Sequence, residues 1–190
     1  MIALIVLLAL AAVVAVYLVG IYNSLVAVRE RVKQAWANID VLLKQRHDEL
    51  PKLIETCKQY MQYEQETLEK VMRARAAVYT ASAGGNVAAV GVAEQQLRGD
   101  IGRLFAVAEN YPELKTSEAF KQLQARVTGL EESIADRREL YNDQANINNT
   151  RIEQFPDVLI ARRYGFNAKP LLEFAAVEKT DVDVGVLFKR

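Results

Sequence analysis

The chain has 190 residues, of which 51% are hydrophobic and 25% are charged, and its only cysteine is Cys57. This length is enough for one soluble domain with its own core beside a membrane segment. Because 24 basic and 24 acidic residues balance, the composition excludes a global electrostatic attraction to nucleic acid, and the single cysteine excludes an intramolecular disulfide.

The first predicted element is an uncharged apolar stretch. No charged residue precedes Arg29, and residues 2–28 exceed the roughly 20 helical residues that cross a bilayer. A secretory signal peptide would carry Lys or Arg ahead of a shorter apolar segment. We therefore predict a retained membrane anchor over residues 1–28, with a buried globular helix as the alternative. Its membrane-spanning residues include Ile2, Leu4, Val6, Leu8, Leu10, Val13, Val16 and Leu18.

The charges beside this stretch predict its orientation. Arg29, Arg31 and Lys33 follow it against one acidic residue, Glu30, and only the α-amino group precedes it. Basic residues favour the cytoplasmic side of a span. We therefore expect the helical domain in the cytoplasm and the N-terminus outside.

Apolar residues continue at helical spacing beyond the anchor. Two rows repeat every eleven residues, a rhythm typical of a nearly straight helix. Proline kinks or breaks a helix, but the rows keep their phase across Pro51. We predict one long, kinked helix from the membrane to about Ala81, and a hairpin near His47–Pro51 is the rival interpretation. The rows are Val28, Ile39, Leu50, Met61 and Met72, and Ile21, Val32, Leu43 and Ile54.

Three further helices are predicted in the rest of the chain. Residues 82–86 contain two glycines and then Asn86, which can cap the second helix. That helix should end at residues 111–112, because the residue before proline avoids the helical region. A third helix should begin near residues 116–117 and be ended or kinked by Pro156. Residues 157–164 predict a short fourth helix.

The C-terminal segment departs from the helical pattern. Gly165 is a suitable stop for the fourth helix, and residues 181–188 alternate in the manner of an extended segment. We prefer a frayed tail, although an ordered tail could add as a short strand to a neighbouring subunit. The sequence thus predicts an all-α fold, in which a transmembrane helix continues into a long antiparallel bundle of about four helices. The predicted parts are an anchor (1–28), a helical bundle (29–166) and an extended or partner-bound tail (167–190).

No group of residues predicts catalysis, a cofactor or a metal site. His47 is the only histidine, so it cannot supply the two Glu-x-x-His pairs of a helical di-metal site, and Lys44 occupies the position of the required Glu. Ten residues along a helix place Cys57 about 15 Å from His47, too far for a nucleophile and its base. We therefore expect no enzyme.

Several polar residues nevertheless lie beside the apolar rows. The preferred interpretation is a structural network that fixes the register of the helices, because buried charges need partners. The alternative is a ligand pocket or a partner surface. The candidates are Arg46, His47, Glu64, Arg75, Glu109, Arg138 and Asn142.

Short motifs in a fixed order point to a family. In chain order they are Tyr22–Val26, Ala35–Asp40, Leu43–Asp48, Pro51, Arg73–Arg75, Ala108–Lys115, Tyr141-Asn142, Asn148-Asn149 and Phe155-Pro156. With this spacing the chain resembles the LemA family of bacterial membrane proteins, although Lys52 stands where that family has an asparagine. The resemblance implies a single-pass protein of the bacterial inner membrane with an antiparallel helical bundle. It implies no established activity and no catalytic residues.

Two functions follow as hypotheses. The first is a non-enzymatic scaffold that self-assembles into a homo-oligomer at the membrane, because apolar rows on long helices can be buried between subunits as in a coiled coil. The expected partners are the lipid bilayer and other copies of the chain, without nucleic acid. The alternative is a membrane-bound ligand or signal sensor with a polar pocket around Arg46, His47 and Glu109.

Overall fold

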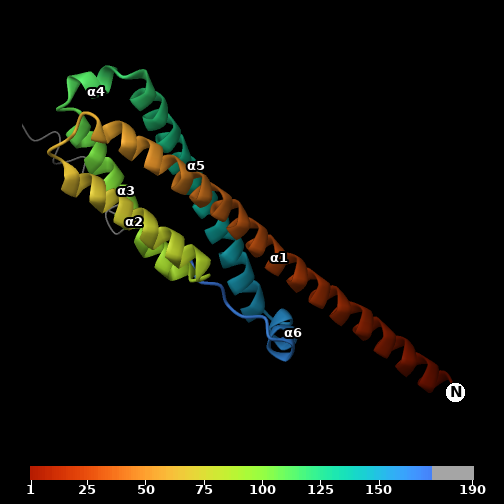
Figure 1. The fold of residues 1–190 in the computed structure, drawn as a ribbon. Coiled ribbons are helices and arrows are strands. Elements are labelled where there is room, and N and C mark those ends of the chain that lie inside the picture. The colour runs from red at the N-terminus through yellow and green to blue at the C-terminus, as the bar shows by residue number, and fades with distance from the viewer. Residues whose placement is uncertain (173–190) are drawn as a thin grey trace, which may run out of the picture. The chain divides into compact units, whose positions relative to one another are not determined.

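The computed structural model describes residues 1–172, and helices account for most of them (Figure 1). No strand occurs within these residues, and the predicted all-α fold is confirmed. The alternating segment at residues 181–188 lies outside the described part. The helices are α1 (Ile2–Lys58), α2 (Gln65–Ala83), α3 (Val87–Ala108), α4 (Pro112–Thr116), α5 (Glu118–Glu153) and α6 (Asp157–Tyr164).

Contacts divide the chain into two compact units, and α1 and α5 each contribute to both. The first unit comprises Met1–Val41 and Ser133–Leu171. The second comprises Leu42–Glu132 and, among the described residues, Leu172. Each unit is described separately below.

The first helix ends earlier than the sequence predicted. Helix α1 continues past Pro51 and stops at Lys58, after which the backbone N–H groups of Tyr60 and Met61 both donate to the Cys57 carbonyl, at 3.0 and 2.8 Å. Helix α2 then starts at Gln65. The predicted helix to about Ala81 and the rival hairpin at residues 47–51 are therefore both wrong.

The turn at residues 59–64 escaped prediction because it preserves the apolar rhythm. Met61, a member of one eleven-residue row, is completely buried within this turn. Helix α2 then buries a row of its own, formed by Leu68, Val71, Ala74 and Val78. The spacing of apolar residues indicates which side of the chain is buried, but it does not indicate where a helix ends. Residues 59–64 contain neither Gly nor Pro, so no turn residue marks the change of direction either.

In the second unit, α2 and α3 lie side by side (Figure 1). The predicted cap of α3 is confirmed, because the Asn86 side chain accepts a hydrogen bond from the Ala89 backbone at 3.1 Å. The predicted break before Pro112 is also present. The five-residue helix α4 was not predicted. It starts at this proline, whose missing N–H is tolerated in a first helical turn.

In the first unit, α6 packs against α1. Ile21 and Leu25 of α1 form a core cluster with Ala161 of α6 and with Phe166. Gly165 ends α6 in a left-handed conformation (φ 71°), as the sequence predicted, and its freedom at positive φ suits that position. The chain thereby returns Phe166 to the α1 surface.

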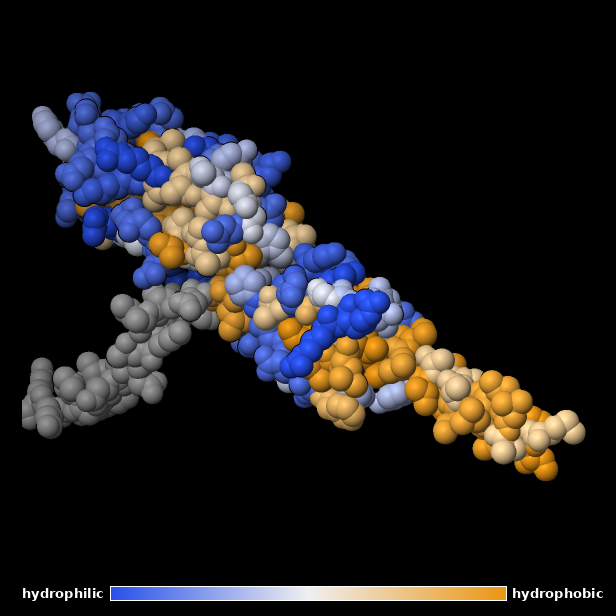
Figure 2. All heavy atoms as spheres, turned by 90° about the horizontal axis from the view of Figure 1, so that it is seen from below, coloured by the Kyte–Doolittle hydropathy of each residue, from blue (hydrophilic) through white to orange (hydrophobic). Residues whose placement is uncertain are grey.

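The N-terminal part of α1 is exposed at every residue up to Gly20. Among the described residues, α1 is the helix long and apolar enough to cross a membrane, and its most apolar stretch is wholly unburied. Figure 2 shows this segment as hydrophobic surface. Such exposure of a long apolar helix would be costly in water, and it suits a lipid environment.

Candidate functional site

The most deeply buried charge in the second unit is Arg46 of α1, which is 1% exposed. Its guanidinium donates to the carboxylate of Glu94 on α3 and, over 2.5 Å, to Oε1 of Glu131 on α5. Burial acts to lower the pKa of Arg46, but the two carboxylates outweigh it and raise that pKa above its ordinary value. Arg46 therefore remains a cation at every physiological pH.

This network joins three helices through charge-assisted hydrogen bonds. A buried charge is tolerated only when its partners are in place, so the network favours one register of α1, α3 and α5. Arg46 was a candidate from the sequence, but Glu94 and Glu131 were missed. Glu94 gave a signal, because it is an acid within the apolar face between Val90 and Leu97.

A second polar group surrounds Pro51. Proline has no N–H, so it leaves the carbonyl of His47, four residues earlier, without its helical donor. Arg75 of α2 supplies that donor, with Nε 2.8 Å from the His47 carbonyl oxygen. Helix α2 thus completes a hydrogen bond that α1 cannot make by itself.

The same arginine also holds the His47 side chain. Arg75 Nη2 lies 2.7 Å from His47 Nε2, and the Tyr79 ring centroid is 4.8 Å from that of the imidazole. Burial, and then the charge of Arg75, lower the pKa of His47 below its ordinary value. The neutral imidazole can accept the hydrogen bond from the arginine, whereas the protonated form could not.

The remaining predicted residues are distributed elsewhere. Tyr111 donates its hydroxyl hydrogen to Glu64 over 3.4 Å, which ties the α1–α2 turn to the start of α4. Glu109 is 59% exposed and pairs with Lys115. Arg138, which is buried, and Asn142 belong to the first unit.

The proposed pocket residues consequently have different partners. Arg46 contacts Glu94 and Glu131, whereas His47 contacts Arg75, and Glu109 faces solvent beside Lys115. The structure brings His47 and Arg75 together, and it gives Arg46, His47 and Glu109 no common partner. This geometry favours a structural role for Arg46 and His47.

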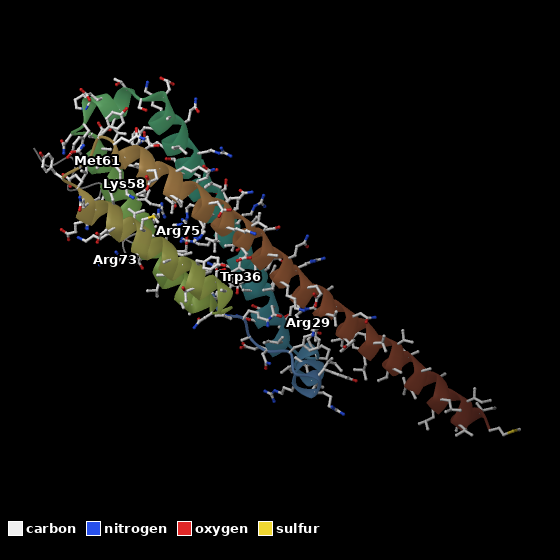
Figure 3. The ribbon with its side chains drawn as sticks, viewed as in Figure 1. Arg29, Trp36, Lys58, Met61, Arg73 and Arg75 are labelled. Atoms are coloured by element: carbon white, nitrogen blue, oxygen red, sulfur yellow. The ribbon has the colours of Figure 1, made fainter. Side chains whose placement is uncertain are left out.

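A groove that the sequence did not predict lies at the hairpin of α1 and α2. It has a volume of about 890 Å³ and is open to solvent. Figure 3 shows Lys58 and Met61 where α1 gives way to the turn, with Arg73 on α2. Lys58 and Arg73 are 56% and 77% exposed. The apolar residues that line the groove are Ile54, Met61, Leu68 and Met72.

The groove could not be predicted because it exists only where residues 59–64 reverse the chain. It offers apolar surface with two cations rather than a set of reactive groups. Each cation also pairs with an acid of its own helix, Lys58 with Glu55 and Arg73 with Glu69, which lines the groove as well. Within residues 1–172, no three or more His, Cys, Asp and Glu side chains gather as metal ligands do. Burial raises the pKa of the nearby Cys57 thiol to about 12, which leaves it without appreciable thiolate. The arrangement suits binding of an apolar segment.

Comparison with known families agrees with these motifs and this fold. The LemA family matches the chain over residues 35–186, which is most of its length. The chain belongs to the LemA family. The match includes the α1–α2 hairpin, and it continues beyond the last described residue into the alternating C-terminal segment.

The sequences of individual relatives align with part or most of this LemA chain. Protein LemA of Metamycoplasma hominis is 25% identical over 89% of this chain and 76% of its own length. Magnetosome protein MamQ 2 of Paramagnetospirillum magneticum is 30% identical over 56% of this chain. The matched part spans 39% of that relative. Neither LemA nor MamQ is the name of an enzyme.

Proposed function

We propose that this LemA-family chain is a non-enzymatic scaffold that is anchored in the bacterial inner membrane and self-assembles there. The single observation that carries the proposal is the open apolar groove of the second unit, in a chain whose first helix also supplies a membrane segment. In the same unit, Arg46 is bound by Glu94 and Glu131, and Arg75 is bound to His47, so we assign these groups to the structure of the unit rather than to a ligand.

The membrane segment determines how assembly would proceed. Tethering confines copies of the chain to a surface and raises their effective concentration, so weak lateral contacts suffice. Arg29, Arg31 and Lys33 follow the segment, and we propose on this basis that the helical domain faces the cytoplasm.

The occupant that we propose for the groove is the C-terminal segment of a second copy. Apolar residues in that segment alternate with Asp181 and Asp183, while Lys58 and Arg73 flank the apolar floor of the groove. Alternate side chains of an extended segment can fill an apolar groove. The acids of the segment would meet the two cations in exchange for their exposed pairs with Glu55 and Glu69, and exposed pairs of this kind contribute little. The apolar residues of the segment are Val182, Val184, Val186 and Phe188.

The chain has enough length for this exchange. Leu172 is buried and belongs to the second unit, and 18 residues follow it. At about 3.3 Å per extended residue they can reach on the order of 60 Å. Exchange of an identical segment between copies is a low-cost route to oligomers.

The test compares the mass of the full-length protein in detergent or nanodiscs across charge variants. We expect an oligomer for the unmodified chain, and smaller particles for Lys58→Glu/Arg73→Glu and for Asp181→Lys/Asp183→Lys. Combining the four substitutions should restore the oligomer, because the charge pairs are then reversed. Lys115→Glu/Lys121→Glu is the matched control, since both side chains are exposed, each pairs with an acid as Lys58 and Arg73 do, and neither lines the groove.

The outcomes separate the parts of the proposal. A monomer at high concentration for the unmodified chain would overturn the scaffold. An oligomer that survives both charge reversals and removal of residues 181–190 would overturn the exchange of segments. A monomer whose C-terminal segment is protected from proteolysis by its own groove would show binding within one copy, and would also overturn self-assembly by exchange.

A further inference from the structure

The end of the apolar segment of α1 coincides with the docking position of α6. Leu18, Val19 and Tyr22 line a shallow surface cleft together with Ile160 and Tyr164 of α6. One turn further along, Ile21 and Leu25 are buried against Ala161 and Phe166. Helix α6 therefore contacts α1 where a span that begins near Ile2 would leave the hydrocarbon, after about 20 residues.

The region of α6 exposes apolar side chains that the protein leaves uncovered. Phe155 is 81% exposed, Leu159 58% and Tyr164 60%. Figure 2 shows the N-terminal segment of α1 as hydrophobic surface. Tyr164 joins the apolar surface of α6 to that segment, because it lines one cleft with Leu18 and Val19 of α1.

Three aromatic rings cluster where α6 contacts α1. The Tyr22 ring lies edge-on to those of Tyr164 and Phe166, with centroids 5.0 and 5.9 Å away. Aromatic side chains, tyrosine in particular, are enriched where membrane meets water, because an apolar ring and a polar tip suit that layer. The cluster is therefore placed as an interfacial belt would be.

Cations surround this patch. Arg162 and Arg163 of α6 are exposed, and Arg29 of α1 lies over the Phe166 ring at 5.3 Å. The acid of α6, Asp157, is already bound by the Arg151 guanidinium. Helix α6 therefore carries two exposed arginines against one acid that is already bound, while Arg29 pairs with Glu30. Arginines with long stems can reach lipid phosphates while their neighbours remain in apolar surroundings.

We propose that α6 lies in the headgroup layer of the membrane that α1 spans, with Leu159, Tyr164 and Phe155 at the acyl boundary and Arg162 and Arg163 on the phosphates of anionic lipids. A short helix with an apolar face and flanking arginines binds membrane surfaces in this way. The inference rests on the proposed membrane anchoring. It adds a second membrane contact, made by a helix far from α1 in the sequence.

The test measures depth-dependent fluorescence quenching in vesicles. The full-length chain with Trp36→Phe, which removes the single tryptophan, receives Leu159→Trp and is reconstituted with lipids that carry a quencher near the top of the acyl chain. We expect quenching in vesicles that contain phosphatidylglycerol. The matched control is Leu140→Trp, an exposed apolar position in the same unit. Leu140 shares a surface hollow with Gln34 and Ala35 of α1, at least twelve residues beyond Tyr22, and should not be quenched.

Further arms distinguish the possible results. Arg162→Gln/Arg163→Gln, or vesicles of phosphatidylcholine alone, should reduce the quenching of the Leu159→Trp protein. Equal quenching in all of these would overturn the phosphate contacts. A protein that floats with the vesicles but shows no quenching at position 159 would overturn the proposal for α6 and leave anchoring intact. A tryptophan at position 159 that is shielded from water but not quenched by the lipids would also overturn the proposal for α6, and would indicate a protein partner instead. Failure of the protein to float with the vesicles would overturn the anchoring itself.

Discussion

At the scale of single residues, Arg46 is the side chain on which the second unit depends most. It is almost completely buried and its partners come from two other helices. Arg46→Ala would leave Glu94 as a buried charge without compensation, and we expect a loss of about 3–5 kcal/mol in the free energy of unfolding. Urea titration followed by circular dichroism in detergent measures this loss.

The control for this prediction is another arginine of the same unit. Arg126 is 69% exposed and pairs with Glu49 at 3.5 Å, so Arg126→Ala should cost at most about 1 kcal/mol. Equal effects of the two substitutions would mean that burial of the Arg46 network does not determine its contribution.

His47 should make stability depend on pH. Burial and Arg75 lower its pKa below the ordinary 6.5, so the unfolded chain binds a proton more readily than the folded one. Well above pH 6.5 the imidazole is neutral in both states, so His47 does not make the free energy of unfolding depend on pH. As the pH falls through 6.5 towards the lower pKa of the folded state, the unfolded chain takes up the proton first and the free energy of unfolding decreases. His47→Gln, which keeps an acceptor for Arg75, should lose less stability than the unmodified chain between about pH 7 and pH 5. Parallel stability curves for the two proteins in chemical denaturation would contradict this assignment.

At the scale of elements, α1 and α2 are coupled through the proline. Arg75→Met removes the donor to the part-buried His47 carbonyl. A fully buried acceptor without a partner costs about 1–3 kcal/mol, so we expect a loss near the lower end of that range. Pro51→Ala restores a backbone N–H that can donate to that carbonyl within α1. We therefore expect Arg75→Met to be less destabilising when Pro51→Ala is also present, as a double-mutant cycle of unfolding free energies would show. Additive effects would indicate that the arginine stabilises the hairpin in another way.

The same elements show what could be predicted from the sequence. Asn86, Gly165 and the break before Pro112 carry local signals of helix starts and stops, and each is where the sequence placed it. The turn at residues 59–64 has no such signal, because burial of Met61 against the folded hairpin determines it. The acidic partners of Arg46 were missed for a related reason. They lie 48 and 85 residues further along the chain, on other helices, and spacing along one helix does not reveal contacts between helices.

At the scale of the whole molecule, the asymmetry of charge beside the span predicts the side on which the domain lies. A reporter fused after Arg190 that is active only in the cytoplasm should therefore be active, and one that requires export should not. Replacing Arg29, Arg31 and Lys33 with Gln should weaken this bias. Activity of the exported reporter alone in the unmodified chain would reverse the proposed orientation, without affecting the family assignment.

The distribution of two unique side chains has a consequence for studies of the whole chain. Trp36, the only tryptophan, lies in the first unit with its ring centroid 5.5 Å from that of Tyr141. Cys57, the only cysteine, is buried in the second unit. Tryptophan emission therefore reports loss of structure in one unit, and thiol labelling reports it in the other, without any substitution. Coincident denaturation curves would establish that the helices shared by both units make them unfold cooperatively, and separate curves would define two independently folding parts.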